Sequence, residues 1–495
     1  MTNPHNKWIR WTVLLFVTLF CMGILTPPNT MAAPQGPQAI APSSYLPMLR
    51  NNVCRGTRAT SNPIGVQIYG GTGYNEQHFH MLQNTASSWI RTSIFWPAIE
   101  GINTTPSSYT WAHADTTLRA AVDNCANIIA TVDHTPTWAS IADERSPIKP
   151  GLLPDYVDFV EDLVERYDGD GFHDNPYGIV VKYWEFYNEP DFGSMSDSIG
   201  WGEYGSEYAA MLNAIYPAVK ATDPEAQVLM GGIAYEFFTT QNGFFVRGFI
   251  DDVLEAGGGK YFDIMSLHHY PFPDHRRNWT EGTSSGLMEK IAYIKAKLEA
   301  YGFKDELAKP LMITETGWHS ENDDLYPSTD DFQGRHIIQL LTQSVASGAE
   351  VVIWWAFQDS GTYPYQTGLT VPPDTIKPAY TVYRDVVKRI GEAEFVRTVM
   401  PATVENDLEI YEFREGGTKK TMYIAWLNPI APFNAEAARS FDDAVTQHWQ
   451  VAGHQATLYR KEGTVLRTVN DGDDGRNDGK VTIKVGKDPI YIVIN

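Results

Sequence analysis

The feature that most constrains the fold is a regular alternation between residues 64 and 390, where short β-branched or aromatic runs are separated by amphipathic stretches. Such runs predict strands buried on both faces, and apolar positions at helical spacing predict helices that cover them. Eight runs are expected to be strands: Ile64–Tyr69, Trp89–Phe95, Asn127–Asp133, Val180–Tyr187, Gln227–Gly231, Phe262–His268, Leu311–Glu315 and Val351–Phe357. Eight stretches are expected to be helices: Glu76–Ser88, Ala114–Asn124, Asp155–Tyr167, Tyr204–Ala221, Phe244–Ala256, Leu287–Tyr301, Asp331–Ser347 and Pro378–Ile390.

Eight consecutive strand–helix units predict an α/β fold, a closed parallel (β/α)8 TIM barrel over residues 60–393. The alternative is an open doubly wound sheet, which usually carries a Gly-rich phosphate loop after its first strand. The G-G-T-G segment at residues 70–73 follows the first predicted strand but lacks the G-x-G-x-x-G spacing. The barrel is therefore favoured.

The pattern changes after about residue 394, where short alternating runs replace the strand–helix units. The expected strands are Leu408–Phe413, Thr421–Leu427, Ala456–Arg460, Val465–Val469, Val481–Val485 and Ile490–Ile494. Short alternating strands separated by turn residues predict a compact antiparallel β-sandwich over residues 394–495. Support of the barrel is its expected role.

Residues 1–33 have the pattern of a secretory signal peptide. Lys7 and Arg10 precede an apolar run of 15 residues, Trp11–Leu25, and the small residues Ala32 and Ala33 follow. The alternative is an uncleaved membrane anchor, but spanning a bilayer takes roughly 20 apolar residues. We therefore expect a secreted, extracellular protein, with residues 34–59 as a linker or N-terminal segment.

The net charge of −22 excludes several classes of partner. An acidic chain without a block of Lys and Arg repels phosphate backbones and anionic lipid. We therefore expect neither nucleic acid nor, after signal cleavage, a membrane as partner. The oligomeric state is open.

Metal binding is not expected from the sequence. After signal cleavage only Cys54 and Cys125 remain, which is too few for a zinc framework. In an oxidising compartment the two form one disulfide, or they remain separate buried thiols. The segment Asn470–Lys480 resembles a calcium loop, but alignment on either of two glycines puts Gly472 or Arg476 at a ligand position. A solvated hairpin turn is expected there.

In a parallel barrel the catalytic side chains lie at the C-terminal ends of the strands. The fourth predicted strand runs into W-E-F-Y-N-E-P at residues 184–190, and the seventh runs into T-E-T-G-W at residues 314–318. Glu189 and Glu315 are therefore expected to face each other across the barrel mouth. Cleavage of a glycosidic bond needs such a pair, because one carboxyl protonates the leaving oxygen while the other attacks the anomeric carbon.

The neighbours of the two glutamates fit this division of roles. Arg91 and Tyr270 are expected to donate hydrogen bonds to Glu315 and to stabilise its charged form. Pro190 is expected to hold Glu189 in an extended conformation at the strand end, since a residue before proline avoids the helical region.

The motifs at the strand ends resemble those of clan A glycoside hydrolases. They are W-E-F-Y-N-E-P at residues 184–190, H-H-Y at 268–270 and T-E-T-G-W at 314–318, and the two glutamates are 126 residues apart. The resemblance covers residues 60–390 well, the C-terminal part only in outline, and is closest to family 39 or family 5. It implies a retaining hydrolase that needs no cofactor, with Glu189 as acid/base and Glu315 as nucleophile.

The resemblance also implies which residues line the subsite of the attacked sugar: Arg91, Asn188, His268, Tyr270 and a tryptophan of the eighth strand. Trp355 fits the W-A-F pattern of this tryptophan better than Trp354 does. His134 resembles the third-strand histidine of family 5, although the Pro-Thr-Trp segment after it is closer to family 39.

Each of these residues also has a structural alternative. Arg91 is then an ion-pair partner in the core, His134 a core histidine, and the tryptophans at the strand ends are packing residues. His268 and His269 point to opposite faces of an extended strand, so one of them is expected to lie outside the pocket.

The sequence predicts a glycoside hydrolase that cleaves β-linked poly- or oligosaccharides. A non-catalytic carbohydrate-binding protein on the same scaffold and a transglycosidase are the alternatives. A serine hydrolase is not expected, because the G-x-S-x-G match at residues 282–286 follows a polar loop instead of a strand.

Overall fold

The computed structural model describes residues 62–69, 76–123, 125–195, 198–271, 286–321, 328–359, 366–373, 375–401, 407–428 and 446–495. All of them belong to one compact unit, Gly56–Asn495. The expected signal peptide, the expected linker, Cys54 and most of the G-x-S-x-G match lie outside the described residues. Cys125 is disulfide-bonded. Among the described helices, none combines the length and apolar character needed to cross a bilayer.

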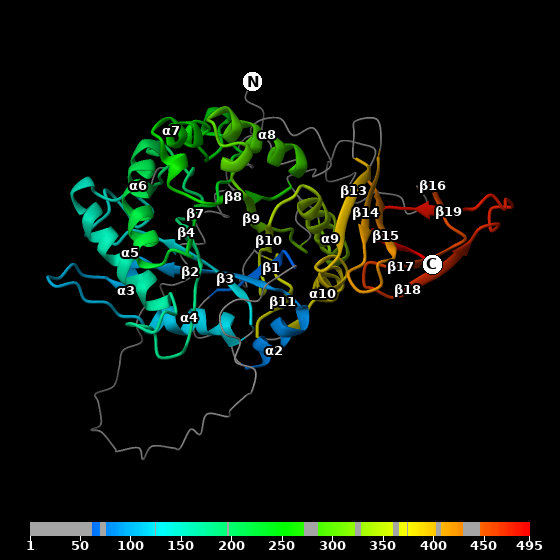
Figure 1. Ribbon diagram of the computed structural model, residues 1–495, viewed down its shortest axis with the longest axis horizontal. Helices are drawn as coiled ribbons and strands as arrows, with labels where there is room; N and C mark the ends of the chain where they lie inside the picture. Colours follow the sequence, from blue (N-terminus) through cyan, green and yellow to red (C-terminus); the bar gives the residue numbers. More distant parts are fainter. Residues whose placement is uncertain are drawn as a thin grey trace, which may run out of the picture. The chain divides into compact units, whose positions relative to one another are not determined.

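Eight parallel strands form the first sheet: β1 (Ile64–Gln67), β2 (Trp89–Phe95), β3 (Asn127–Asp133), β4 (Tyr183–Phe186), β7 (Gln227–Met230), β8 (Met265–His269), β9 (Leu311–Thr316) and β10 (Val351–Trp354). Their order is β7-β4-β3-β2-β1-β10-β9-β8 (Figure 1). The outer strands β7 and β8 meet through parallel bridges, Leu229 with Ile264 and Ile233 with Leu267, so the sheet closes. The predicted (β/α)8 barrel is confirmed.

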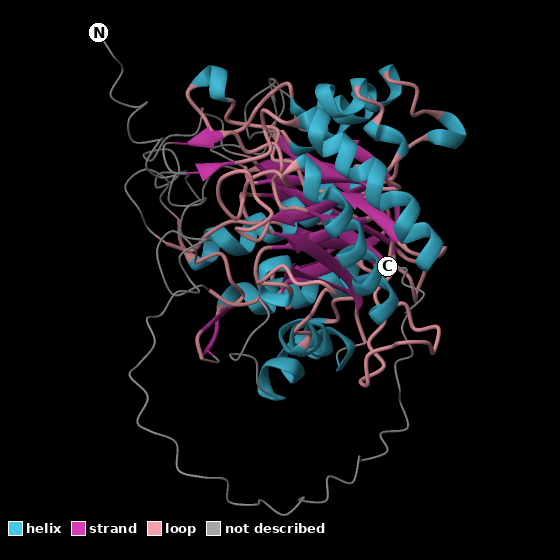
Figure 2. Ribbon diagram, turned by 90° about the vertical axis from the view of Figure 1, so that its left-hand side faces the viewer, coloured by secondary structure: helices cyan, strands magenta, loops and turns pink. Residues whose placement is uncertain are grey.

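Helices surround the strands, as Figure 2 shows. They are α2 (Glu76–Thr85), α4 (Ala112–Asp123), α5 (Leu153–Tyr167), α6 (Gly205–Thr222), α7 (Phe249–Glu255), α8 (Leu287–Ala300), α9 (Asp330–Ala346) and α10 (Pro378–Ile390), with a single turn α3 (Trp96–Ile99) after β2. Helix α5 illustrates why they form, because its apolar residues recur at helical spacing and are buried while its acidic face is not.

The interior of the barrel is apolar at one end and polar at the other. The apolar cluster comes from the first three residues of the strands or just before them: Trp89, Ile129, Leu229, Ile264, Met312, Val351 and Ile353. Further along the same strands the buried residues include Arg91, Glu185 and Glu315. This polarity places the chemistry at the C-terminal ends of the strands.

The C-terminal residues form two antiparallel sheets. Six strands pair in the order β13-β14-β15-β20-β17-β18, and two more, β16 and β19, pair with each other. The bounds are β13 Glu394–Met400, β14 Leu408–Arg414, β15 Thr421–Leu427, β16 Gln447–Ala452, β17 Gln455–Tyr459, β18 Val465–Asn470, β19 Lys480–Val485 and β20 Ile490–Ile494. One apolar core joins residues of both sheets, including Ile410, Leu458 and Ile483, which confirms the predicted β-sandwich.

The differences from expectation include two strands of the C-terminal sheets and one segment before α7. The sequence predicted neither β13 nor β16, whose side chains are mostly exposed or half-buried and so lack a clear apolar alternation. The helix expected over 244–256 begins only at Phe249. Phe245 before it forms bridges with Phe192 and Phe238, so this apolar run is buried by packing on the β4–α6 connection.

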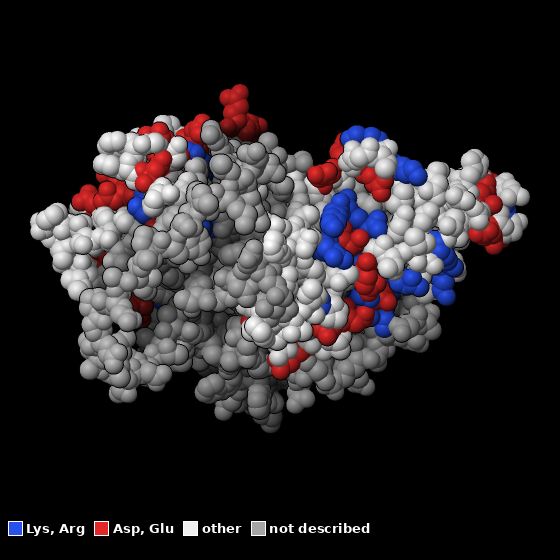
Figure 3. Space-filling view, turned by 90° about the horizontal axis from the view of Figure 1, so that it is seen from below, with Lys and Arg blue, Asp and Glu red and all other residues white. Residues whose placement is uncertain are grey.

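The described surface includes regions of mixed charge. On the face shown in Figure 3, basic and acidic side chains lie next to one another over the right-hand part of the molecule. Ion pairs of the C-terminal sheets include Arg397 with Glu412 and Arg414 with Glu394, all on β13 and β14. Exposed pairs of this kind contribute little to stability.

Candidate active site

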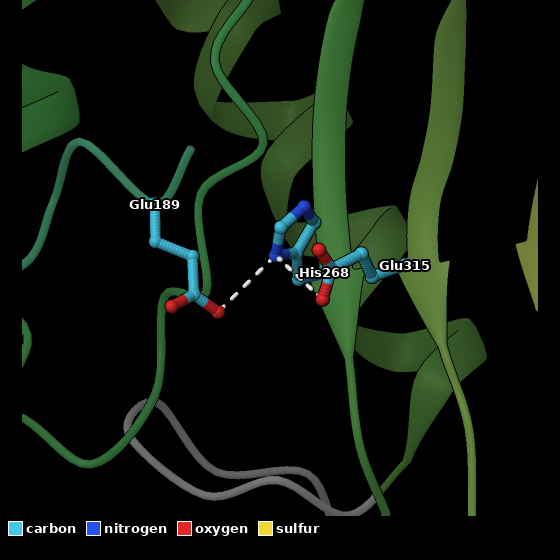
Figure 4. Close-up of side chains that lie close together, drawn as sticks. All are labelled: Glu189, His268 and Glu315. Carbon is cyan, nitrogen blue, oxygen red and sulfur yellow. Dashed lines mark hydrogen bonds and ion pairs between the residues drawn. The ribbon is translucent and has the colours of Figure 1, made fainter. Parts of the chain in front are cut away.

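The two glutamates predicted from the strand ends lie close together, with His268 between them (Figure 4). Glu315 is part of β9, whereas Glu189 follows β4 by three residues. One carboxylate oxygen of each and one ring nitrogen of His268 all lie within 4.8 Å of one another. The side chain of Glu315 is 7% exposed and that of Glu189 is 16% exposed.

The backbone around Glu189 is not extended, so the expectation drawn from Pro190 is wrong. Glu189 has φ 46° and Tyr187 has φ 64°, which is the left-handed region that residues with side chains rarely adopt. The N–H of Glu189 donates to the carbonyl of Gly232, and the carbonyl of Glu189 accepts from the N–H of Phe192, both at 3.0 Å. These two bonds hold the turn that aims Glu189 at the barrel mouth.

Glu315 accepts two short hydrogen bonds, one from the buried Arg91 and one from the half-buried Tyr270. The Arg91 guanidinium donates to its Oε1 at 2.6 Å, and the Tyr270 hydroxyl donates to its Oε2 at 2.6 Å. A carboxylate held by a cation and a phenol hydroxyl is stabilised in its charged form and fixed in orientation. Both contacts expected from the sequence are therefore present.

Arg91 is at once a core ion-pair residue and a neighbour of the site. Its side chain is 1% exposed, and it also donates to Oε2 of Glu185 at 2.7 Å and to Oδ1 of Asn188 at 2.7 Å. Burial opposes its charge, but Glu185 and Glu315 outweigh burial and raise the pKa of Arg91.

Glu189 has a different environment from Glu315. Burial raises its pKa to about 7, although Arg145, Arg91 and Lys290 act in the opposite direction. Its Oε1 lies 3.1 Å from Nδ1 of His268.

Burial lowers the pKa of His268 to about 4, so this imidazole is neutral at neutral pH. Its Nδ1 also lies 3.7 Å from Oε2 of Glu315. A Cβ on Gly232 would lie 2.2 Å from its Nε2, so glycine is needed for the end of β7 to approach the ring. His268 is therefore confined beside both carboxylates as a neutral polar group.

Of the two adjacent tryptophans, Trp355 is the one beside the site. Its ring meets that of Tyr270 edge to face, with centroids 6.2 Å apart, and its indole N–H donates to the hydroxyl of Tyr69. Trp354 is fully buried and donates to the carbonyl of Thr367 at 3.0 Å.

His134 contacts Asp133 and Phe95. Its Nδ1 is 3.1 Å from Oδ2 of Asp133, and its ring meets Phe95 edge to face at 4.9 Å. Asp133 in turn accepts a long hydrogen bond, 3.4 Å, from the N–H of Asn188. The structure thus brings the other predicted residues together around the two glutamates and places His134 against Asp133.

Sequence reasoning missed several charged residues behind the site. Glu185 is fully buried on β4 and accepts from Arg91 and from the Thr131 hydroxyl. The sequence did contain a signal for Glu185, because an acidic residue inside a strand predicted to be buried needs a charged or hydrogen-bonding partner. Asp191, Glu236 and Lys290 are also buried. Their hydrogen-bond partners are far away in the sequence, so no local pattern marks these residues.

Within the described part of the chain, two groups of carboxylate or imidazole side chains have ligand atoms close enough together to hold a cation. The first is Glu189, His268 and Glu315, and the second is Asp168, Asp170 and Asp174 in the loop after α5. In the first group the Arg91 guanidinium already contacts Glu315 at 2.6 Å, and its positive charge opposes a second cation there.

No protein-family model matches the sequence, and no curated protein matches it significantly. Solved structures do resemble it. A family 39 glycoside hydrolase from the gut symbiont Bacteroides cellulosilyticus WH2 is 17% identical, with a TM-score of 0.64 over 88% of this chain and 81% of that one. A GH30 endoxylanase from Clostridium papyrosolvens C71 is 14% identical, with a TM-score of 0.56 over 89% and 98%.

A monomeric beta-xylosidase from Caulobacter crescentus CB15 is also 14% identical, with a TM-score of 0.56 over 88% of this chain and 97% of that one. At these identities the likeness establishes the fold, a (β/α)8 barrel followed by β-sheets. Family 39, one of the two families that the strand-end motifs resemble, is named among these structures.

Proposed function

We propose that the protein is a secreted, retaining glycoside hydrolase that cleaves β-glycosidic bonds of a poly- or oligosaccharide by double displacement. The observation that carries this proposal is the pair Glu189 and Glu315, with carboxylate oxygens within 4.8 Å of each other in unlike surroundings. Retaining glycosidases hold their two carboxyl groups about 5–5.5 Å apart, whereas inverting ones leave about 6.5–9.5 Å for a water molecule. An approach of one oxygen from each carboxylate to within 4.8 Å fits the shorter, retaining arrangement.

In the first step Glu315 attacks the anomeric carbon and Glu189 protonates the leaving oxygen. Arg91 and Tyr270 hold both oxygens of Glu315, which orients the carboxylate and keeps it charged. Glu189 retains its proton up to about neutral pH because burial raises its pKa to about 7. The two carboxyls thus begin the reaction in the different protonation states that it needs.

In the second step a water molecule attacks the glycosyl-enzyme. The ester on Glu315 no longer carries a negative charge, and Glu189, which has given up its proton, accepts one from the water. The sugar leaves with its original anomeric configuration after two inversions. His268 is neutral at this pH and lies 3.1 Å from Glu189, so it supports either protonation state without adding charge.

Extracellular or cell-wall polysaccharide is the proposed substrate class. The structural neighbours support a sugar substrate, since their names include an endoxylanase and a beta-xylosidase. One of these names refers to xylan and the other to a β-xyloside. Xylan and aryl β-xylosides are therefore among the first probes to use.

The test is hydrolysis of a panel of aryl β-glycosides and polysaccharides by the mature protein and by Glu315→Ala and Glu189→Ala. Both variants should lose activity. Azide should then give an α-glycosyl azide from Glu315→Ala, because it replaces the nucleophile, and a β-glycosyl azide from Glu189→Ala, because it attacks the glycosyl-enzyme. Addition of acceptor sugars separates a hydrolase from a transglycosidase.

Two outcomes would contradict the proposal. Full activity in Glu315→Ala would show that the site is wrongly assigned. Glycan binding by the wild type without cleavage of any probe would favour a carbohydrate-binding protein on the same scaffold.

Secretion rests on the N-terminal pattern of a basic start, an apolar run and small residues. N-terminal sequencing of protein recovered from the medium of an expressing culture should show cleavage near Ala32 or Ala33. Retention of the full chain in the membrane fraction would favour an uncleaved anchor.

A further inference from the structure

Lys290 is a buried cation behind the proposed active site that the mechanism above does not use. It lies in the first turn of α8, and its side chain is 1% exposed. Its ammonium group donates to the backbone carbonyl of Ala234, to Oε2 of Glu236 at 3.0 Å and to the backbone carbonyl of His268 at 2.9 Å. All three donor positions of the ammonium group are therefore used.

The acceptors of Lys290 belong to segments that carry the partners of Glu189. The N–H of His268 donates to the carbonyl of Ile233 at 2.9 Å, which ties β8 to the segment after β7. Lys290 ties the same two segments a second time, through Ala234 and His268. Its bond to the main chain of His268 acts on the residue whose ring lies against Glu189.

The segment after β7 is also fixed to the end of β4. Both oxygens of Asp191 accept backbone N–H groups, from Ala234 at 3.1 Å and from Tyr235 at 2.8 Å. Asp191 follows Glu189 by two residues, and Glu189 itself donates to the carbonyl of Gly232. Lys290 thus sits where the ends of β4, β7 and β8 are joined.

Lys290 lies near two other buried ionisable side chains, Asp191 and Glu236. Burial raises the pKa of Asp191 and of Glu236 to about 7, and the Lys290 ammonium opposes this for both. An ion pair that only anchored α8 would need one carboxylate partner, and replacement of such a pair by neutral groups is often harmless. Two of the three acceptors here are backbone carbonyls at strand ends, which a helix anchor does not require.

We propose that Lys290 is a positioning residue for the acid/base. Its ammonium joins the ends of β7 and β8 so that His268 stays against Glu189 and the acid keeps its aim at the leaving oxygen. This inference rests on the proposed glycosidase function. It predicts a defect in proton transfer to the leaving group, since Glu315 keeps Arg91 and Tyr270 as its own partners.

The experiment compares aryl glycosides of the sugar that the wild type cleaves, with 2,4-dinitrophenol or phenol as the leaving group. Dinitrophenolate departs without a proton, so its release does not test the acid, whereas phenolate needs one. For Lys290→Met we expect kcat/KM to fall at least about 10-fold for the phenyl glycoside and to change less than about 3-fold for the dinitrophenyl glycoside, because general acid catalysis supplies about 10²–10⁴-fold.

A second readout is azide. Azide should raise kcat for the dinitrophenyl glycoside in Lys290→Met and not in the wild type, because a misplaced Glu189 is also a poor base for water. The double variant Lys290→Met/Glu236→Gln removes both buried charges, which restores electrical balance, and it should show the same leaving-group dependence. The amount of dinitrophenolate released in the first turnover gives the concentration of active sites. Rates are expressed per active site, so partial unfolding does not distort the leaving-group comparison or the azide comparison.

Lys295→Met is the matched control, because Lys295 lies on the same helix and its ammonium donates to the carbonyl of Ser347. It should behave as the wild type. Equal losses on both glycosides without an azide effect, or failure of both Lys290 variants to fold, would assign Lys290 a purely structural role and overturn the inference. If the wild type and Glu189→Ala cleave neither glycoside, it is the proposed function that fails instead.

Discussion

Glu189 and Glu315 are identical side chains that lie close together, and their surroundings give them unlike properties. Glu315 accepts from a guanidinium and a phenol hydroxyl at 2.6 Å each. Glu189 faces a neutral imidazole at 3.1 Å, and burial dominates its pKa. The assignment of nucleophile and acid/base therefore follows from the partners of each residue, not from the motif alone.

The raised pKa of Glu189 predicts the alkaline limb of the pH profile. In the proposed mechanism Glu189 must carry a proton in the first step, and a pKa raised from 4.5 to about 7 keeps that proton up to neutral pH. Above pH 7 the proton is lost, so kcat/KM for a phenyl glycoside should fall tenfold per pH unit. The measurement is a pH–rate profile of the wild type beside Glu189→Ala, and an alkaline limb that persists unchanged in the variant would contradict the prediction.

The sequence revealed the site residues that follow a predicted strand and belong to a motif, such as Glu189, Glu315 and Tyr270. It did not reveal Lys290 or Asp191, because their partners lie on other strand ends and nothing local marks them. The left-handed turn at Glu189 was also missed. Local rules favour an extended residue before proline, and the hydrogen bond to Gly232 overrides them.

At the scale of elements, helix α6 joins the ends of two strands close to Glu189. The hydroxyl of Tyr208 donates to the carbonyl of Phe186 at the end of β4, 2.6 Å away, and accepts from the N–H of Gly231 after β7 at 2.9 Å. All three groups are buried, and the hydroxyl provides a hydrogen-bond partner to both backbone groups.

Tyr208→Phe should therefore destabilise the protein by about 1–3 kcal/mol, the usual loss when buried polar groups are left unsatisfied. Urea unfolding of variant and wild type measures this difference. Tyr216→Phe is a control on the same helix, because the Tyr216 hydroxyl donates to a partly exposed carboxylate, that of Asp263. Equal losses in the two variants would show that the bridge between strand ends adds nothing.

Elements buried on both faces could be predicted because their apolar runs are continuous. The barrel strands β2 and β3 match the expected bounds, and both consist almost wholly of buried residues. The half-exposed strands β13 and β16 have no such run, so they form strands through pairing with β14 and β19 and cannot be recognised from their own sequence. The apolar residues before α7 suggested helix, but bridges to the β4–α6 connection bury them instead.

At the scale of the whole molecule, α9 connects the barrel to the C-terminal sheets. Its buried residues extend around the helix and include polar ones, as expected for a helix covered on more than one side. Arg335 pairs with Asp488 at 2.6 Å. Gln343 donates to Oε2 of Glu409 on β14 at 2.9 Å, and Glu409 is fully buried. The role expected for the C-terminal domain, support of the barrel, stays a prediction that these contacts make testable.

If the C-terminal sheets support the barrel, the two should unfold together, and Gln343→Leu should weaken that coupling. Burial raises the pKa of Glu409, and loss of the Gln343 donor leaves its buried carboxyl with the Tyr411 hydroxyl and the Asn428 amide, at a loss of about 1–3 kcal/mol.

Hydrogen exchange should show β2 and β14 opening in one transition in the wild type and β14 opening first in the variant. Gln450→Leu, which removes an exposed bond to Thr482, should leave the single transition intact. Separate transitions already in the wild type would mean that the sheets fold independently and that the barrel does not need them.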